Sequence, residues 1–470
     1  MSRLRTRMAA GAVLGVTALV LGAVTSAGSA AASGAKSTSY YKVERTCHSA
    51  ARVNHATCYA LRLVPASKFT AGANARPASM NAAAGPAGGY SPAQLAKAYG
   101  VNASGSTSIT VGIVDAFDDP TAKADLNHFD AQYGLPAETS SSFKKVSQTG
   151  STSTFPTGTS WATEITLDLD AVRGLCHKCK IVLVEANSSS FSDLSAAVNQ
   201  AVAQGAKVIS NSYGGQESGH DSTLESRYNH KGVVITASTG DDGYFSWDHQ
   251  NDAGTSPGVA NIPSTLNTVV AVGGTSLQLN DNGTRSSEAV WNENGHLDVT
   301  GNNLSSAMGA TGGGCSTLYN AQSWQANVAN YANTGCGSKR LAADISALAD
   351  PYTGYDIYGT TGLTGWATFG GTSLSSPLIA AMFALAGGAH GVDYPSQTIY
   401  KNFKSTPKDF YDVTEGGNGF CGGSSPASCK ARFTGNVGPN NFFGVQVDCG
   451  FKGTTSTLTN KTRACDAATG

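Results

Sequence analysis

The sequence predicts an α/β fold in which helices cover both faces of a mostly parallel central sheet. Two observations predict it: short apolar runs rich in Val and Ile recur along the chain, and segments with a helical pattern separate them. Strands that are buried on both faces and alternate with helices form parallel sheets. A length of 470 residues with 40% hydrophobic content allows a large core. In such a sheet, catalytic groups lie at the carboxyl ends of the strands.

The alternation of strands and helices begins near Tyr90. The first helix is expected to start at Asp119 and Pro120, which are typical of a helix N-terminus. The segment SWATEITLDLDAVRGL has the apolar stripe that a helix would bury. The predicted strands are 108–117, 180–186, 206–215 and 232–243, and the predicted helices are 119–134, 160–175 and 194–205.

The N-terminus has the features of a secretory signal peptide. Three arginines precede an uncharged apolar run of about fifteen residues, and small residues follow at Ala30–Ala32. The run is short for a membrane-spanning helix, and no later stretch is long and apolar enough for one. We therefore expect residues 1–32 to be removed and the protein to be secreted, extracellular and free of the membrane.

Residues 33–89 are expected to form a short pro-segment or linker before a single domain at 90–470. The second half of this leader is rich in Ala, Gly and Pro with little periodicity, which is typical of an exposed, cleavable linker. Maturation is expected near residues 80–90. The net charge of −1, with only 13% charged residues, excludes a basic surface for nucleic acid.

The ten cysteines fit an extracellular protein because they form pairs that are close in the sequence. Cys176 and Cys179 have two further interpretations, a redox centre or a zinc site with His177. A zinc site needs a second pair of ligands at a suitable spacing, and none is evident, so a structural disulfide is favoured. The five expected pairs are Cys47 with Cys58, Cys176 with Cys179, Cys315 with Cys336, Cys421 with Cys429, and Cys449 with Cys465.

The string GGTSL occurs twice, and the two contexts differ. Ser276 follows one strand-like segment and precedes another, so it is expected to end a core strand. Ser373 follows a Gly-Gly turn and precedes a buried apolar helix with Pro377 in its predicted first turn. Free backbone N–H groups and the helix dipole at that position stabilise an oxyanion. Ser373 is therefore the candidate nucleophile.

A serine nucleophile needs a base, and no histidine of this chain lies in a recognisable catalytic motif. Glu164 and Asp168 offer carboxylates instead. Their spacing of four puts both on one face of the predicted helix. If both point into a cleft, they share a proton, which raises the pKa of one and gives a base that works at acidic pH.

Several motifs in a fixed order resemble those of the sedolisins, the secreted serine-carboxyl peptidases, and especially their actinobacterial members. The motifs are ITVGIVDAFDDP, EITLD, STGDDG, AVGGTSL, ADISALADPYTG and GGTSLSSP. The resemblance runs from residue 89 to the end of the chain. It implies a subtilisin-like three-layer fold and hydrolysis of peptide bonds in acid.

The resemblance also implies the catalytic roles. Glu164 would be the general base, Asp168 the carboxylate that orients it, Asp241 the oxyanion partner and Ser373 the nucleophile. Three acidic residues are rivals: Asp242 for the role of Asp241, Asp170 for that of Asp168, and Asp115 as a further residue lining the cleft.

Two further sites follow from the resemblance. A calcium ion would be held by Asp412, the carbonyl of Val413 and Asp466, although the stretch 413–465 is longer than family members usually have. Ser212, Tyr213 and Gly214 would lie on the edge strand that binds the peptide substrate. The family also commonly carries a large folded prodomain, and residues 33–89 are too few for one.

Two other functions remain open on the sequence. The chain could be a secreted inactive homologue that binds proteins or peptides without cleaving them. It could also be an esterase or lipase that uses Ser373, but no GxSxG motif surrounds this serine. Acid peptidase activity on protein or peptide substrates, by a monomer, is the favoured prediction.

Overall fold

The computed structural model describes residues 40–47, 54–66, 74–75, 85–243, 260–292, 309–328, 331–334 and 336–413. The predicted signal peptide, Asp466 and the cysteine pairs after residue 420 lie outside these ranges. Within them, the helices are all too short or too polar to cross a bilayer.

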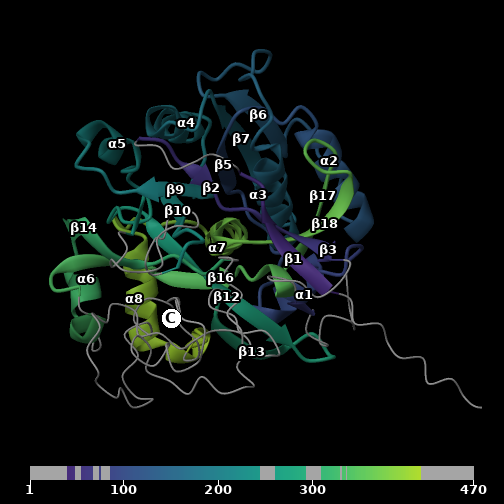
Figure 1. The fold of residues 1–470 in the computed structure, drawn as a ribbon. Coiled ribbons are helices and arrows are strands. Elements are labelled where there is room, and N and C mark those ends of the chain that lie inside the picture. Colours follow the sequence, from purple (N-terminus) through teal and green to yellow (C-terminus); the bar gives the residue numbers. More distant parts are fainter. Residues whose placement is uncertain are drawn as a thin grey trace, which may run out of the picture. The chain divides into compact units, whose positions relative to one another are not determined.

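The central sheet has eight strands, and it confirms the predicted mostly parallel arrangement (Figure 1). Every pairing in this sheet is parallel except that between β12 and β13. Along the sheet the strands are β6 (Phe143–Ser147), β7 (Lys180–Ala186), β5 (Thr110–Ala116), β8 (Val208–Asn211), β10 (Val234–Ser238), β12 (Val270–Leu279) and β13 (Arg285–Val290), with β16 (Ile345–Leu348) also paired to β12.

Helices cover both faces of this sheet. Successive residues of a strand point to opposite faces, so apolar side chains lie on both of them and pack against helices. Ile113 and Leu183 belong to one apolar cluster, and their neighbours Val114 and Val184 belong to another. The first cluster contains apolar residues of α1 (Pro92–Ala98), α2 (Ala122–Tyr133), α3 (Ala162–Leu175), α7 (Thr372–Leu385) and α8 (Ser396–Ser405). The second contains those of α4 (Phe191–Ala203) and α5 (Ser222–Arg227).

Several predicted boundaries differ from the structure: α2 starts at Ala122 instead of 119, β10 ends at Ser238 instead of 243, and two further differences have local reasons. Helix α4 starts three residues before the predicted 194, because the Ser190 side chain caps it by accepting a hydrogen bond from the Asp193 N–H. The predicted strand 206–215 is interrupted at Ser212. Its second half, β9 (Tyr213–Gln216), leaves the central sheet and pairs with β11 (Asn261–Ile262) and with β2 (Thr57–Cys58).

The described part of the leader is built into the domain that follows it. Strands β1 (Tyr40–Arg45), β3 (Leu61–Ala66) and β4 (Asn74–Ala75) form an antiparallel sheet with β17 (Tyr355–Gly359) and β18 (Gly365–Gly370). A further pair, β14 (Gly314–Asn320) and β15 (Lys339–Ala342), lies near the short helix α6 (Ser323–Ala326).

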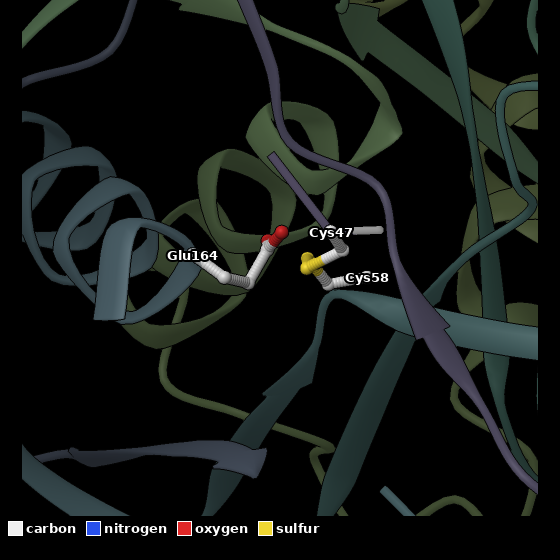
Figure 2. Close-up of side chains that lie close together, drawn as sticks. All are labelled: Cys47, Cys58 and Glu164. Carbon is white, nitrogen blue, oxygen red and sulfur yellow. A yellow bond between two sulfur atoms is a disulfide. The ribbon is translucent and has the colours of Figure 1, made fainter. Parts of the chain in front are cut away.

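Three of the five expected disulfides fall within the described ranges, and all three are formed: Cys47–Cys58, Cys176–Cys179 and Cys315–Cys336. Figure 2 shows the Cys47–Cys58 disulfide beside the side chain of Glu164. One atom from each of these three side chains lies within 4.8 Å of the other two. Because both sulfurs are in a disulfide, they are not the thiolates that a metal ion would need.

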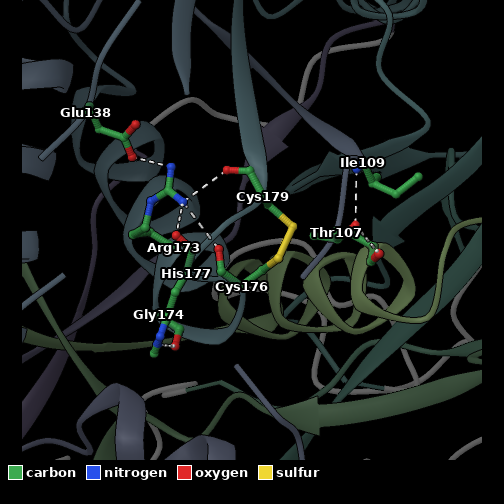
Figure 3. The surroundings of a disulfide bond; sticks show 9 residues. Thr107, Ile109, Glu138, Arg173, Gly174, Cys176, His177 and Cys179 are labelled. Atoms are coloured by element: carbon green, nitrogen blue, oxygen red, sulfur yellow. Dashed lines mark hydrogen bonds and ion pairs between the residues drawn. A yellow bond between two sulfur atoms is a disulfide. The ribbon is translucent and has the colours of Figure 1, made fainter. Parts of the chain in front are cut away.

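The Cys176–Cys179 disulfide closes the turn after α3, which confirms a structural role for this pair (Figure 3). The Arg173 guanidinium donates from Nη1 to the carbonyls of Cys176, His177 and Cys179 at 3.3, 2.8 and 3.0 Å. It also forms a buried ion pair with Glu138. The end of α3 is thereby held while the start of the helix carries the site described next.

Candidate functional site

Helix α3 presents Glu164 and Asp168 one turn apart, as predicted. Both side chains are fully buried, and every residue of α3 is buried. Ile165, Leu169 and Val172 pack into the apolar cluster on the same face of the sheet as α7. The two helices are in contact, and α7 carries Ser373.

Helix α7 begins earlier than the sequence predicted. It starts at Thr372, so Ser373 lies in its first turn and Pro377 lies inside the helix. Pro377 has no N–H, so it cannot bond to the carbonyl of Ser373 four residues before it. The Ser212 hydroxyl donates to that carbonyl instead, at 3.1 Å. The missing helical hydrogen bond is thus replaced by one from the strand side.

Ser212 also connects α7 to the carboxylate of Asp168. Its hydroxyl oxygen lies 2.7 and 2.8 Å from the two Asp168 oxygens. The hydrogen bonds that we find for the Asp168 carboxyl therefore go to Ser212, whereas Glu164 acts on Asp168 electrostatically and raises its pKa. This differs from a carboxylate that simply orients Glu164, because Asp168 acts on the backbone of the nucleophile through Ser212.

Ser373 and Glu164 meet in the interior. The Ser373 hydroxyl donates to the Ser212 carbonyl at 3.2 Å, and it lies close enough to the Glu164 carboxyl to lower the pKa of that group. Burial and the nearby Asp115 act in the opposite direction and dominate, so the pKa of Glu164 lies well above its usual range. Burial, with Asp115 and Glu164 nearby, likewise raises the pKa of Asp168. The side chain of Ser373 itself is fully buried.

Asp241 lies after the carboxyl end of β10 and contacts the start of α7. Its Oδ1 accepts hydrogen bonds from the backbone N–H and the hydroxyl of Thr372, both at 2.8 Å. Its Oδ2 has no hydrogen-bond partner among the described residues. Burial raises the pKa of Asp241 to about 7, although Arg45 and Thr372 lower it. Asp241 therefore keeps its proton in acid, and its Oδ2 is an oxygen without a partner among the described residues.

The rivals of these acidic residues lie elsewhere or have other partners. Asp242 is partly exposed and forms an ion pair with Arg45 at 2.5 Å. Asp170 accepts a hydrogen bond from the Tyr358 N–H at 2.9 Å, on the β17 side of α3. Neither is the group that hydrogen-bonds at the N-terminus of α7.

Asp115 has a more central position in the site than the sequence indicated. It lies near the end of β5, it is fully buried, and neither of its carboxyl oxygens has a hydrogen-bond partner among the described residues. Burial raises its pKa to about 8. Its position near the carboxyl end of a central parallel strand was the signal available, since that is where catalytic groups gather. Glu164, Asp168, Asp241 and Asp115 are called the carboxyl cluster below.

Ser276, in the first GGTSL string, has a structural role, but it lies inside a continuous strand instead of at the predicted strand end. Ser276 lies in β12 and donates to Asp350 Oδ2 at 2.6 Å. Asp350 in turn accepts from the Tyr352 N–H. Although the two serines share five letters of sequence, only Ser373 lies at a helix start beside buried carboxyls.

Of the predicted substrate-binding residues, Tyr213 and Gly214 lie in β9, the middle strand of a small sheet in which the leader strand β2 covers one edge of β9, and Ser212 directly precedes this strand. The backbones of Tyr213 and Gly214 pair with Cys58 and Thr57 of the leader. The Tyr213 hydroxyl points away from this edge and hydrogen-bonds to Asn211 and Tyr228 at 2.7 and 2.9 Å. Backbone pairing, rather than the Tyr213 ring, is what this edge offers to a peptide. A cavity of about 580 Å³ extends from Arg45 and Cys47 to Trp161.

The predicted calcium ligands are only partly described. Asp412 is exposed and Val413 is buried, and both lie just after α8, at the end of the described residues. A carboxylate and a backbone carbonyl are hard oxygen ligands of the kind that calcium takes. Because Asp466 lies outside the described ranges, the calcium site stays a prediction.

Comparisons with known proteins agree with this fold. The profile of the subtilase family, peptidase S8, matches residues 106–399. Sedolisin from Pseudomonas sp. (strain 101) is 30% identical over 360 residues, which are 74% of this chain and 59% of the relative. Kumamolisin from Bacillus sp. (strain MN-32) is 29% identical over 350 residues, which are 70% of this chain and 57% of the relative. The chain thus spans less than two thirds of the length of these relatives.

A solved structure supports the same relationship. It is that of Pseudomonas sedolisin, a serine-carboxyl proteinase, complexed with two molecules of pseudo-iodotyrostatin. It superimposes with a TM-score of 0.59 at 29% identity and covers 73% of this chain and 93% of that chain. The parallel sheet flanked by helices on both faces is the fold that these comparisons share. This chain therefore belongs to the subtilase family and is similar to its serine-carboxyl members, as the sedolisin-like motifs predicted.

Proposed function

We propose that this protein is a secreted serine-carboxyl endopeptidase that cleaves protein or peptide substrates in acid through an acyl-enzyme. The observation that carries the proposal is the closeness of Ser373 to the buried Glu164 carboxyl, since Ser373 Oγ and Glu164 Oε2 accept hydrogen bonds from the backbone N–H groups of two consecutive residues, Tyr59 and Ala60. Among the described residues, no histidine hydrogen-bonds to Ser373. The base available to this serine is thus a carboxylate.

The proposed reaction uses the side chains already placed. Ser373 attacks the scissile carbonyl while Glu164 takes its proton and later gives it to the leaving amine. Protonated Asp241 donates a hydrogen bond from Oδ2 to the developing oxyanion, together with the backbone N–H of Ser373. Asp168 holds the first turn of α7 through Ser212. Each group has a role that depends on its protonation state.

Secretion and calcium binding belong to the same proposal. Secretion is supported by the N-terminal sequence with its arginines, apolar run and small residues. Calcium would be held by Asp412, the Val413 carbonyl and Asp466, and would stabilise the end of the domain. A monomer without a membrane anchor completes the proposal.

Replacing the nucleophile tests the activity, and the chain offers a matched control. We expect Ser373→Ala to lower the hydrolysis of excess denatured protein at pH 3–5 by about a thousandfold or more, because the acyl-enzyme cannot form. Ser276→Ala, in the same GGTSL string, should keep most of the activity, since that serine only bonds to Asp350. Equal hydrolysis by wild type and Ser373→Ala would sink the proposal and favour an inactive homologue that binds proteins or peptides.

The role of Asp241 predicts a specific change in the pH profile. In the wild type, activity should fall as the pH rises through about 7, where the pKa of Asp241 lies, because the ionised carboxylate no longer donates. In Asp241→Asn the amide donates at every pH, so this alkaline fall should disappear. Asp241→Ala lacks a donor and should be slow throughout. A wild-type alkaline limb retained in Asp241→Asn would contradict the role.

The buried carboxyls also predict how stability varies with pH. The folded protein keeps the Asp115 proton up to about pH 8, whereas the unfolded chain loses it near 3.8, so this group stabilises the fold most below pH 4. The free energy of unfolding, measured in urea, should therefore decrease between pH 4 and pH 8. Asp115→Asn should flatten this decrease, and Asn at the exposed Asp281 should not. An unchanged slope in Asp115→Asn would refute the assignment.

A further inference from the structure

Part of the leader crosses the catalytic site. We call the described residues 40–47 and 54–66 the leader strap. The Tyr59 backbone N–H donates to Ser373 Oγ at 3.0 Å, and the Ala60 N–H donates to Glu164 Oε2 at 2.9 Å. The backbone N–H groups of these two consecutive residues therefore contact the proposed nucleophile and the proposed base. The Tyr59–Ala60 bond lies where a scissile bond would lie.

The carbonyl of Tyr59 lies at the position expected for the oxyanion. Gly371 has a φ of 88°, and a side chain there would collide with the Tyr59 carbonyl oxygen. The same added Cβ would come within 2.7 Å of Asp241 Oδ2, so both oxygens lie against Gly371. Asp241 Oδ2 has no hydrogen-bond partner among the described residues. Protonated Asp241 is thus placed to donate to the Tyr59 carbonyl.

The residues before this bond bind as an extended peptide does. Thr57 and Cys58 pair antiparallel with Gly214 and Tyr213, which adds a strand to the edge that was predicted to bind substrate. The Tyr59 side chain is 1% exposed. A Cβ on Gly214 would come within 2.7 Å of its hydroxyl, so the ring fills a pocket that depends on glycine at this edge.

The strap holds both sides of the Tyr59–Ala60 bond independently of that bond. On the tyrosine side, Cys58 is joined to Cys47 by the disulfide, and Arg45 forms an ion pair with Asp242. On the alanine side, the backbone N–H and the hydroxyl of Thr46 both donate to the Ala60 carbonyl, at 3.2 and 3.1 Å. Cys47 follows Thr46 directly, so one short segment is bonded to the chain on both sides of the Tyr59–Ala60 bond.

Strand pairing also holds the chain on both sides of this bond. Strand β1 pairs with β3 along its whole length, from Tyr40 opposite Ala66 to Arg45 opposite Leu61. Strand β3 also pairs with β18, which leads directly into Gly371 and α7. The chain after the bond is therefore a strand of the domain sheet, and the chain before it is paired to that strand.

We propose that the leader strap is a tethered, substrate-like inhibitor with Tyr59–Ala60 as its reactive bond, kept in the cleft by the Cys47–Cys58 disulfide. This inference rests on the proposed peptidase function. The cleft is occupied by a segment of this chain. The strap covers the edge of β9 that an added substrate would need. The strap and a protein substrate therefore compete for the same residues.

The reaction at the reactive bond is ordinary acyl transfer. Ser373 Oγ forms an ester with the Tyr59 carbonyl carbon, the bond from that carbon to the Ala60 nitrogen breaks, and the serine proton passes through Glu164 to that nitrogen. Water then hydrolyses the ester, or the Ala60 amine attacks it and restores the peptide bond. Because both new ends stay paired, cleavage alone does not empty the site.

The test compares full-length variants in which only one disulfide differs. Cys47→Ser/Cys58→Ser frees the strap, and Cys315→Ser/Cys336→Ser removes a disulfide that is separate from it. At pH 4 with a fluorogenic peptide, the first variant should have an initial rate about tenfold or more above wild type, because its strap leaves the cleft more readily. The control variant should match wild type. Mass spectrometry of acid-incubated, denatured wild type should show a fragment beginning at Ala60, which Ser373→Ala lacks.

A second variant covers the case in which the disulfide mutant does not fold. Tyr59→Gly keeps the disulfide and removes the ring from its pocket, so it should also raise the initial rate. Equal rates in wild type, Tyr59→Gly and the strap disulfide variant, or cleavage at another bond of the strap, would overturn the proposal while leaving the peptidase function standing. Rates no higher than that of Ser373→Ala in every variant would overturn both.

Discussion

The rest of the structure depends on one constraint, the burial of acidic side chains. These side chains lie at the carboxyl ends of β5 and β10 and on the inner face of α3. A buried carboxylate is costly unless it is paired or protonated. Asp115 has no hydrogen-bond partner among the described residues, and burial raises its pKa to about 8. Asp115 and Asp241 therefore keep their protons in acid, where the fold does not have to bury a charge at either position. The fold and the proposed chemistry share one pH range for this reason.

The packing of α3 against α7 gives this cluster its geometry. Glu164 and Asp168 are one turn apart on α3, and Ser373 is in the first turn of α7. Pro377 removes a helical hydrogen bond, and Ser212 replaces it while also holding Asp168. The strap then supplies backbone N–H groups that donate hydrogen bonds to Ser373 Oγ and to Glu164. Two buried oxygens of the site thus find their donors in a peptide from the same chain, as they would in a substrate.

Local patterns predicted the parts of the site that depend on local geometry. The spacing of Glu164 and Asp168 placed both on one helical face, and the helix after Ser373 separated it from Ser276. The prediction for the start of α7 was wrong because Pro377 lies inside the helix, where the hydroxyl of the distant Ser212 replaces the hydrogen bond that proline cannot make. Asp115 was undervalued because burial at a strand end is a property of the assembled sheet. The pairing of Thr57 with Gly214 joins residues far apart in the sequence, so nothing in the leader itself indicated it.

The central claim is that Glu164 is the base that activates Ser373, and the rate of acylation with and without that carboxylate tests it most directly. Glu164→Gln keeps the shape of the side chain and can still accept the Ala60 N–H, but it cannot take a proton. Rapid mixing with a peptide substrate at pH 4, followed by mass spectrometry of acylated Ser373, measures this step alone. The account predicts that acylation in Glu164→Gln is slower than in wild type by about a hundredfold or more. Acylation of Ser373 at the wild-type rate in this variant would contradict it.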